Sequence, residues 1–229
     1  MFGRPFRTQK GTPPMKLRSD SFQHGGRIPA AFAFGQRGAD GRFAPSQNRS
    51  PHLAWADLPA GTRSLVLVCH DPDVPSRADD VNQDGRRVPA DLPRVTFHHW
   101  LLMDLTPETG ELPEGAFSDG ITPRGKAGPE VAGHAALRHG VNDYTGWFAG
   151  DADMGGTYYG YDGPCPPWND TIVHHYHFTL YALGVDRAPV DGAVTGTALL
   201  AAIAPHVVGQ AGIMGTYSIA ADVVDATGA

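Results

Sequence analysis

The 229-residue chain lacks several features that would indicate a membrane location or a nucleic-acid partner. No apolar run approaches the ~20 residues that a membrane-spanning helix needs, and no apolar stretch follows the basic residues Arg4, Arg7 and Lys10. Basic residues are also scarce, since 18 Lys and Arg stand against 24 Asp and Glu, for a net charge of −6. Non-specific binding of nucleic acid needs a cationic face that displaces counterions. We therefore expect a cytoplasmic protein without a transmembrane segment that does not bind nucleic acid.

Cysteine is rare, and the motifs of several enzyme classes are missing. The two cysteines, Cys69 and Cys165, do not make a disulfide framework. There is no His-Glu-x-x-His or Cys-x-x-Cys metal motif, no Gly-x-Ser-x-Gly elbow of the α/β-hydrolases and no Walker phosphate loop. These absences favour a binding protein, with no catalytic residue, metal or cofactor, over the enzymes that such motifs mark.

Glycine and proline are abundant and charge is low, which is typical of β-rich folds with many turns. The chain holds 29 Gly and 20 Pro, and 18% of its residues are charged. We expect a disordered tail over residues 1–14 and a single mainly β domain over residues 15–229. Strands are expected at the continuous apolar run Ser64–His70 and at the patterned segments Arg94–Leu105 and Ile172–Leu183.

The remaining regions are expected to form loops, one helix and a last strand. Residues 71–91 and most of 106–163 are rich in Gly, Pro and Asp, and we expect them to be loops. An amphipathic helix is expected over Thr197–Gly209, either kinked at Pro205 or split there into two short helices, with a final strand over Gly212–Ile219.

Three segments combine stiff backbone with side chains that exchange protons. They are Asp71–Ser76, His98–Trp100, and Gly163–Pro167 with the following His174–Phe178. Proline and glycine loops hold polar groups in place. We expect these segments to meet in one preformed pocket of Asp and His that suits a small anion.

Strand alternation predicts which side chains share a face. It places His99 beside Phe97, Leu101 and Met103 on one strand. On the later strand, His174 and Tyr176 share one face, whereas His175 and His177 share the other.

Two other functions remain open at this point. His175 and His177 supply two ligands for a metal-dependent hydrolase, but a zinc site needs three or four. A structural protein that dimerises through the aromatic segment Tyr144–Phe148 is the other alternative. Cys165 is interpreted either as a small buried residue or as a reduced thiol near the pocket.

Eight segments, taken in order, resemble a known protein family. They are Ser50–Trp55, Pro59–Ser64, Asp71–Ser76, His98–Trp100, Asn142–Tyr144, Gly160–Pro167, His174–Leu183 and Gly215–Tyr217. The chain is similar to the phosphatidylethanolamine-binding proteins, also called the Raf kinase inhibitor protein family, in their bacterial and archaeal branch. This resemblance implies an antiparallel β-sandwich with a large central sheet and a C-terminal helix.

The resemblance also implies a ligand site, which we carry over residue by residue. It implies a small pocket for phosphate, phosphoryl head groups or phosphorylated ligands, formed by Asp71, Asp73, His99, Gly163, Pro164, His174 and Tyr176, with Tyr217 closing it. In that site His99 and His174 would donate hydrogen bonds to the anion, Gly163 its N–H, and Asp71 would orient an imidazole. A non-enzymatic protein with a protein kinase or protease as partner, and a homodimer, are further expectations.

Two departures from the family pattern concern this pocket. His175 stands where the family usually has Arg after the pocket histidine. Residues 147–157 also look like an insertion at the pocket rim.

Overall fold

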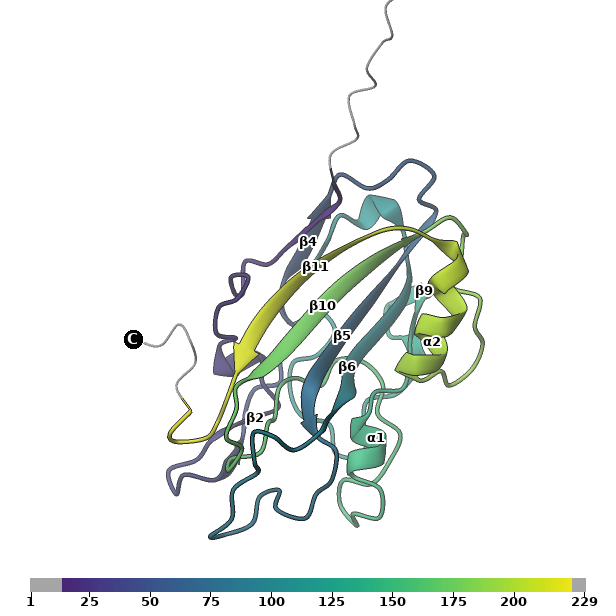
Figure 1. Ribbon diagram of the computed structural model, residues 1–229. Coiled ribbons are helices and arrows are strands. Elements are labelled where there is room, and N and C mark those ends of the chain that lie inside the picture. The colour runs from purple at the N-terminus through teal and green to yellow at the C-terminus, as the bar shows by residue number, and fades with distance from the viewer. Residues whose placement is uncertain (1–13, 224–229) are drawn as a thin grey trace, which may run out of the picture.

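The computed structural model describes residues 14–223, and its centre is a six-stranded antiparallel sheet (Figure 1). Its strands lie in the order β11 (Val207–Tyr217), β10 (His174–Leu183), β5 (Ser64–Pro75), β6 (Arg94–Leu105), β9 (His134–His139) and β8 (Glu130–Val131). The central strands are rich in β-branched and aromatic residues, which pack well on a pleated, buried surface. The three strands expected from the sequence are therefore neighbours in the middle of this sheet.

A second, smaller sheet covers one face of the first. It consists of β1 (Lys16–Arg18), β4 (Leu53–Ala56) and β7 (Glu111–Leu112). Buried side chains of both sheets meet in one core, with Leu53 of β4 against residues such as Leu67, Trp100 and Phe178 of the large sheet. This arrangement confirms the mainly β sandwich with a large antiparallel sheet. A hairpin of β2 (Gly35–Arg37) and β3 (Phe43–Pro45) stands apart from both sheets.

The other face of the large sheet packs against helix α2 (Gly196–Ile203), which lies near β6 and β9 in Figure 1. Leu199 and Ile203 of the helix are buried with Val66 and Leu101 of the sheet. The helix begins after Thr195, whose hydroxyl accepts a hydrogen bond from the N–H of Ala198. Both faces of the central strands are therefore covered, as the continuous apolar run in β5 requires.

The predicted end of the helix is wrong. The helix stops at Ile203, a 3₁₀ turn follows at Ala204–His206, and β11 begins at Val207 rather than at Gly212. Pro205 has no N–H for a helical hydrogen bond, so the helical segment is split into α2 and the 3₁₀ turn, as the second alternative expected, and it does not reach Gly209.

Two regions expected as loops contain secondary structure. β5 continues through Asp71 to Pro75, so the Asp-Pro segment is part of the sheet. The region 106–163 contains a 3₁₀ turn at Pro107–Thr109, the strands β7 to β9 and the short helix α1 (Tyr144–Trp147). Another 3₁₀ turn lies at Ala30–Phe32. These elements are too short to give a clear periodic pattern.

The alternation predicted for β6 fails beyond His99. His98 pairs with His70 and Trp100 pairs with Cys69, so β6 has one extra residue at this point of the ladder. As a result, Trp100 faces the core between the sheets, and Leu101 faces α2. A bulge of this kind moves the following side chains to the opposite face.

Two expectations about the organisation of the chain stay predictions. The tail over residues 1–14 lies outside the described residues except for Pro14, and the single domain over residues 15–229 is untested. Within residues 14–223, no helix is long and apolar enough to cross a membrane.

Two neighbouring leucines of α2 test its packing against the sheet. Leu199 is fully buried whereas Leu200 is only partly buried. Leu199→Ala should lower the free energy of unfolding by about 2–5 kcal/mol, and Leu200→Ala by only about 1 kcal/mol. Urea denaturation measures both values, and equal losses for the two variants would contradict this orientation of the helix.

Candidate functional site

A cavity of about 280 Å³ lies where β5, β6 and β10 bring their polar residues together. These strands supply four of its polar groups, Asp71, His99, His174 and Tyr176, while Arg77 and Asn82 come from the loop after β5. Most of the remaining lining is apolar and includes the aromatic side chains of Phe34, Phe97, Tyr144, Trp147, Phe148 and Trp168. The three segments expected to converge therefore do so, at the polar end of an aromatic cavity.

His174 is fully buried between two carboxylates. Its Nδ1 lies 2.7 Å from Asp71 Oδ2, and its Nε2 lies 3.0 Å from Asp170 Oδ2. Burial alone would lower the pKa of His174, but the two carboxylates raise it to about 9. The ring is therefore an imidazolium that donates both of its protons to the protein, so neither is left for a ligand.

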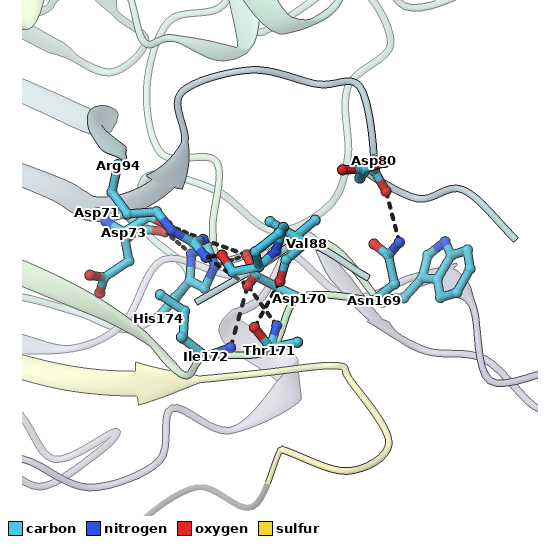
Figure 2. A network of polar contacts seen from close by, with 12 residues as sticks. Asp71, Asp73, Asp80, Val88, Arg94, Asn169, Asp170, Thr171, Ile172 and His174 are labelled. Atoms are coloured by element: carbon cyan, nitrogen blue, oxygen red, sulfur yellow. Dashed lines mark hydrogen bonds and ion pairs between the residues drawn. The ribbon is translucent and has the colours of Figure 1, made fainter. Parts of the chain in front are cut away.

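Asp170 extends this network to β6, as Figure 2 shows. Both terminal nitrogens of Arg94 bind its carboxylate, at 2.6 and 3.1 Å. Burial opposes ionisation, yet the hydrogen bonds and charges of His174 and Arg94 hold the pKa of Asp170 below 3.8. The pKa of Asp71 is likewise lowered, because the charge of His174 outweighs the effect of burial. Two cations and two anions thus balance one another in this network.

His99 is buried, and its ring protonation state is fixed by the backbone. Its Nδ1 lies 2.8 Å from the carbonyl oxygen of Asp162, which can only accept, so Nδ1 carries the proton. Burial lowers the pKa of His99 below 6.5, despite nearby negative charge. The ring is therefore neutral at pH 7, and Nε2, which has no hydrogen-bond partner within residues 14–223, is an acceptor.

The Asp162 side chain holds the loops around His99. Its carboxylate accepts hydrogen bonds from the side chains of Asn48, Lys126 and Asn142, at 2.7 to 2.9 Å. Asp162, Asn48 and Asn142 are buried. Our sequence analysis missed these roles, although the resembling segments around Asn142 and Asp162 contain two of the residues.

Gly163 and Pro164 lie behind the cavity wall and do not line it. The N–H of Gly163 donates to Asn48 Oδ1 at 2.8 Å, so it does not face a ligand. A Cβ at Gly163 would lie 2.0 Å from the carbonyl oxygen of Phe32, which explains the glycine by close packing. The carbonyl of Pro164 accepts from the N–H groups of Phe34 and Gly35.

Four other residues expected at the site or in a metal centre lie outside the cavity lining, namely Asp73, His175, His177 and Tyr217. Asp73 Oδ2 accepts hydrogen bonds from the backbone N–H of His175 and lies 2.8 Å from its Nδ1. His177 stacks on His70 with 5.3 Å between ring centroids. Tyr217 is buried, and its hydroxyl donates to the carbonyl of Gly35. Among the residues that the structure describes, no three His, Cys, Asp or Glu are arranged to hold a metal ion.

Cys165 and residues 147–157 were expected near the pocket and at its rim, but not as ligand-binding residues. Cys165 lines the cavity, and burial raises the pKa of its thiol to about 12. Its backbone N–H has no hydrogen-bond partner in the described part of the chain, and the prolines on either side have no N–H at all. Trp147 and Phe148, at the start of the expected insertion, do lie at the cavity. Arg77 lines it as well, with a side chain that is 67% exposed.

The pH dependence of stability should report the ion pairs of His174. The pKa of an ordinary histidine is 6.5, whereas the pKa of His174 in the folded protein is about 9. The stabilisation is therefore complete below pH 6.5 and is lost as the pH rises through 9. We expect the free energy of unfolding to fall over this range by an amount on the order of 3 kcal/mol, measured by urea denaturation.

Two variants isolate this effect from the other titrating groups. His174→Gln should be less stable at pH 6.5 and should lose this decline, because no imidazolium remains to be deprotonated. His206→Gln, which removes an imidazole outside the network, should retain the decline. An unchanged slope in His174→Gln would contradict the charged state of His174.

A matched pair of glycine variants tests the packing of Gly163. Gly163→Ala should destabilise the protein by at least ~1–3 kcal/mol, because its Cβ meets the backbone of Phe32. Gly146→Ala meets no atom within 4 Å and lies in helix α1, so it should be neutral or stabilising by up to ~1 kcal/mol. Thermal unfolding of both variants is the measurement, and equal stability would show that Gly163 is not required by packing.

Comparisons with known proteins agree with this fold. Residues 18–218 match the family model described as phosphatidylethanolamine-binding protein. The UPF0098 protein YbhB of Escherichia coli K12 is 32% identical over 204 residues, which cover 89% of this chain and 100% of YbhB. A UPF0098 protein of Methanothermobacter thermautotrophicus is 30% identical, over 89% of this chain and 98% of its own length.

Solved structures give the same result for the fold. CT736 of Chlamydia trachomatis, described as a phosphatidylethanolamine-binding protein homologue, has a TM-score of 0.60 at 28% identity, covering 90% of this chain and 97% of its own. Escherichia coli YbcL, described as a member of the mammalian PEBP family, has a TM-score of 0.63 at 22% identity, over 89% and 98% of the two chains, and supports the fold alone.

A further relative bears on location. LppC of Mycobacterium tuberculosis, whose name describes it as a lipoprotein, is 31% identical over 89% of this chain and 72% of its own length. The cytoplasmic location of the present protein therefore stays a prediction. Its family is settled by the match over residues 18–218: the chain belongs to the phosphatidylethanolamine-binding protein family.

Proposed function

We propose that this protein is a non-enzymatic binding protein that holds the phosphoryl group of a small phosphorylated ligand at the polar end of its cavity. The observation that carries the proposal is the convergence of Asp71, His99 and Tyr176, from three neighbouring strands, on one cavity with aromatic walls. A pocket with apolar walls and a few converging polar groups is the usual form of a small-molecule site. Its volume of about 280 Å³ suits a small ligand.

The donors of this site are Tyr176 and the backbone of Cys165. Burial, the nearby charge of Asp71 and a hydrogen bond to its carboxylate raise the pKa of Tyr176 well above 10, so its hydroxyl keeps a proton, which Asp71 accepts until a ligand competes for it. The N–H of Cys165 is the one donor that the segment 163–167 leaves without a partner in the described residues. Arg77 adds a positive charge at the exposed side of the cavity.

This assignment changes two roles expected from the sequence. His174 and Gly163 were expected to donate to the anion, but their protons are bound by Asp71, Asp170 and Asn48. We now assign His174 to the support of Asp71, and Gly163 to the packing of the cavity wall.

The protonation states favour binding over nucleophilic chemistry. A cysteine attacks as the thiolate, and burial keeps the Cys165 thiol protonated by raising its pKa to about 12. His174 cannot serve as its base, because both ring nitrogens already bind carboxylates. The role of a protein kinase or protease as partner, and the homodimer, stay predictions.

Titration with phenyl phosphate tests the proposal directly. Isothermal calorimetry should detect binding by the wild-type chain, and Tyr176→Phe should weaken it by roughly 10-fold to 150-fold through loss of one hydrogen bond to a charged group. Tyr181→Phe is the control, since Tyr181 lies on the same strand but packs in the core beside α2. Absence of heat with the wild-type protein, or equal losses in the two variants, would contradict the proposed site.

A further inference from the structure

The polar end of the cavity offers a ligand strong hydrogen-bond acceptors but no charged donor. Asp71 is ionised, and its carboxylate has about four lone-pair sites, of which Asp73 N–H, His174 and the Tyr176 hydroxyl use three, so one is left for a ligand. His99 presents Nε2 as an acceptor, since Nδ1–H is bound by the carbonyl of Asp162. The candidate donors are the N–H of Cys165 and the neutral hydroxyl of Tyr176, whose proton Asp71 accepts in the free protein.

The positive charges beneath the cavity are already matched by negative ones. The imidazolium of His174 donates to Asp71 and Asp170, and Arg94 binds Asp170. Both ring protons of His174 are thus bound by the protein, and Arg94 does not line the cavity. Arg77 is mostly exposed to solvent and is paired with Asp79 at 3.6 Å, so it supplies little fixed charge inside.

Within residues 14–223, the surroundings of His99 give no other positive partner for an anion. The charged and titratable groups near its ring, taken from every element packed against it, are Asp71 on β5, His70 on β5, His174 and Tyr176 on β10, Tyr144 on α1, and Asp143 and Asp162 in the adjoining loops. His70 has a pKa lowered to about 4 by burial and by neighbouring histidines, so it is uncharged at neutral pH. Apart from His174, the charged groups around His99 are carboxylates.

A phosphate monoester meets these acceptors differently in its two charge states. The dianion has only lone pairs to offer, so its oxygens would face the Asp71 carboxylate and His99 Nε2 without a proton between them. The monoanion carries one P–O–H, which can donate to either group. A sulfate monoester has the same shape and a single charge, but no proton at neutral pH.

We propose that the cavity selects phosphate monoesters in their singly protonated form and rejects sulfate monoesters of the same shape, with Asp71 and His99 as the acceptors of the ligand's proton. This inference rests on the proposed function and adds the protonation state that the site recognises. Specificity of this kind arises because a buried acceptor left without its proton costs more than a neutral contact.

Calorimetry with phenyl phosphate and phenyl sulfate tests the inference on the full wild-type chain. Because phosphate monoesters lose their second proton near pH ~6, affinity for phenyl phosphate should fall on the order of 100-fold between pH ~6.5 and ~8.5. At the upper end of this pH range, binding of each phenyl phosphate should be accompanied by the uptake of about one proton from the buffer. Calorimetry in buffers of different ionisation enthalpy measures this number. Phenyl sulfate should bind at least ~100-fold more weakly than phenyl phosphate at pH ~6.

The possible failures are distinguishable. No binding of phenyl phosphate at any pH overturns the proposed function together with this inference. Binding of phenyl phosphate with a flat pH profile overturns the inference alone. Phenyl sulfate that binds as tightly as phenyl phosphate also overturns the inference. That result would show that His99 takes up the proton and becomes a hydrogen-bond donor to the ligand.

Two variants keep the test independent of folding defects. Asp71→Asn replaces an acceptor by an amide that can donate, and should reduce the preference for phosphate over sulfate about tenfold or more. Asp71→Asn also removes a partner of buried His174, so a second variant is needed. His99→Gln likewise replaces an acceptor by an amide that can donate, and it should also reduce the preference for phosphate over sulfate. His206→Gln, outside the cavity, should keep the wild-type ratio. An unchanged ratio in a folded His99→Gln and a folded Asp71→Asn would overturn the assignment of these acceptors.

Discussion

The geometry of the cavity depends on the buried imidazolium of His174 between Asp71 and Asp170. A charge without solvent contact is tolerated only when its protons are bound and its charge is matched, and both conditions hold here. The three residues come from β5, from β10 and from the segment before β10, while Arg94 of β6 holds Asp170 from the other side. This network therefore fixes three strands relative to one another and sets the position of the Asp71 carboxylate.

A second network controls what the cavity can recognise without lining it. Asp162 is satisfied by Asn48, Lys126 and Asn142, and its carbonyl binds the Nδ1 proton of His99. That single hydrogen bond makes Nε2 an acceptor. The hydrogen-bonding character of the site is therefore set by residues behind the cavity lining. Their own hydrogen bonds restrict how far they can move.

The sequence predicts the parts of this arrangement that depend on local pattern. Alternation places His174 and Tyr176 on the buried face of β10, and the apolar run in β5 predicts a strand covered on both faces. Local pattern does not reveal the extra residue of β6 at His99, because a bulge is set by pairing with β5. Nor does it reveal that Asn48, 115 residues away, takes the N–H of Gly163. Such long-range partners decide which protons remain for a ligand.

Membership of the family establishes the fold of this chain but does not identify its ligand. The overall fold is shared with solved relatives, but the supply of protons at the cavity depends on individual contacts in the loops. His175, where the family pattern has Arg, is bound to Asp73 outside the cavity, and the nearby guanidinium of Arg94 is used on Asp170. Because the cations next to the polar end in residues 14–223 are already paired, attraction of an anion by fixed charge is weak. In the binding function that we propose, recognition therefore comes from the placement of acceptors and neutral donors, and the protonation state of the ligand, more than its total charge, selects among phosphorylated molecules.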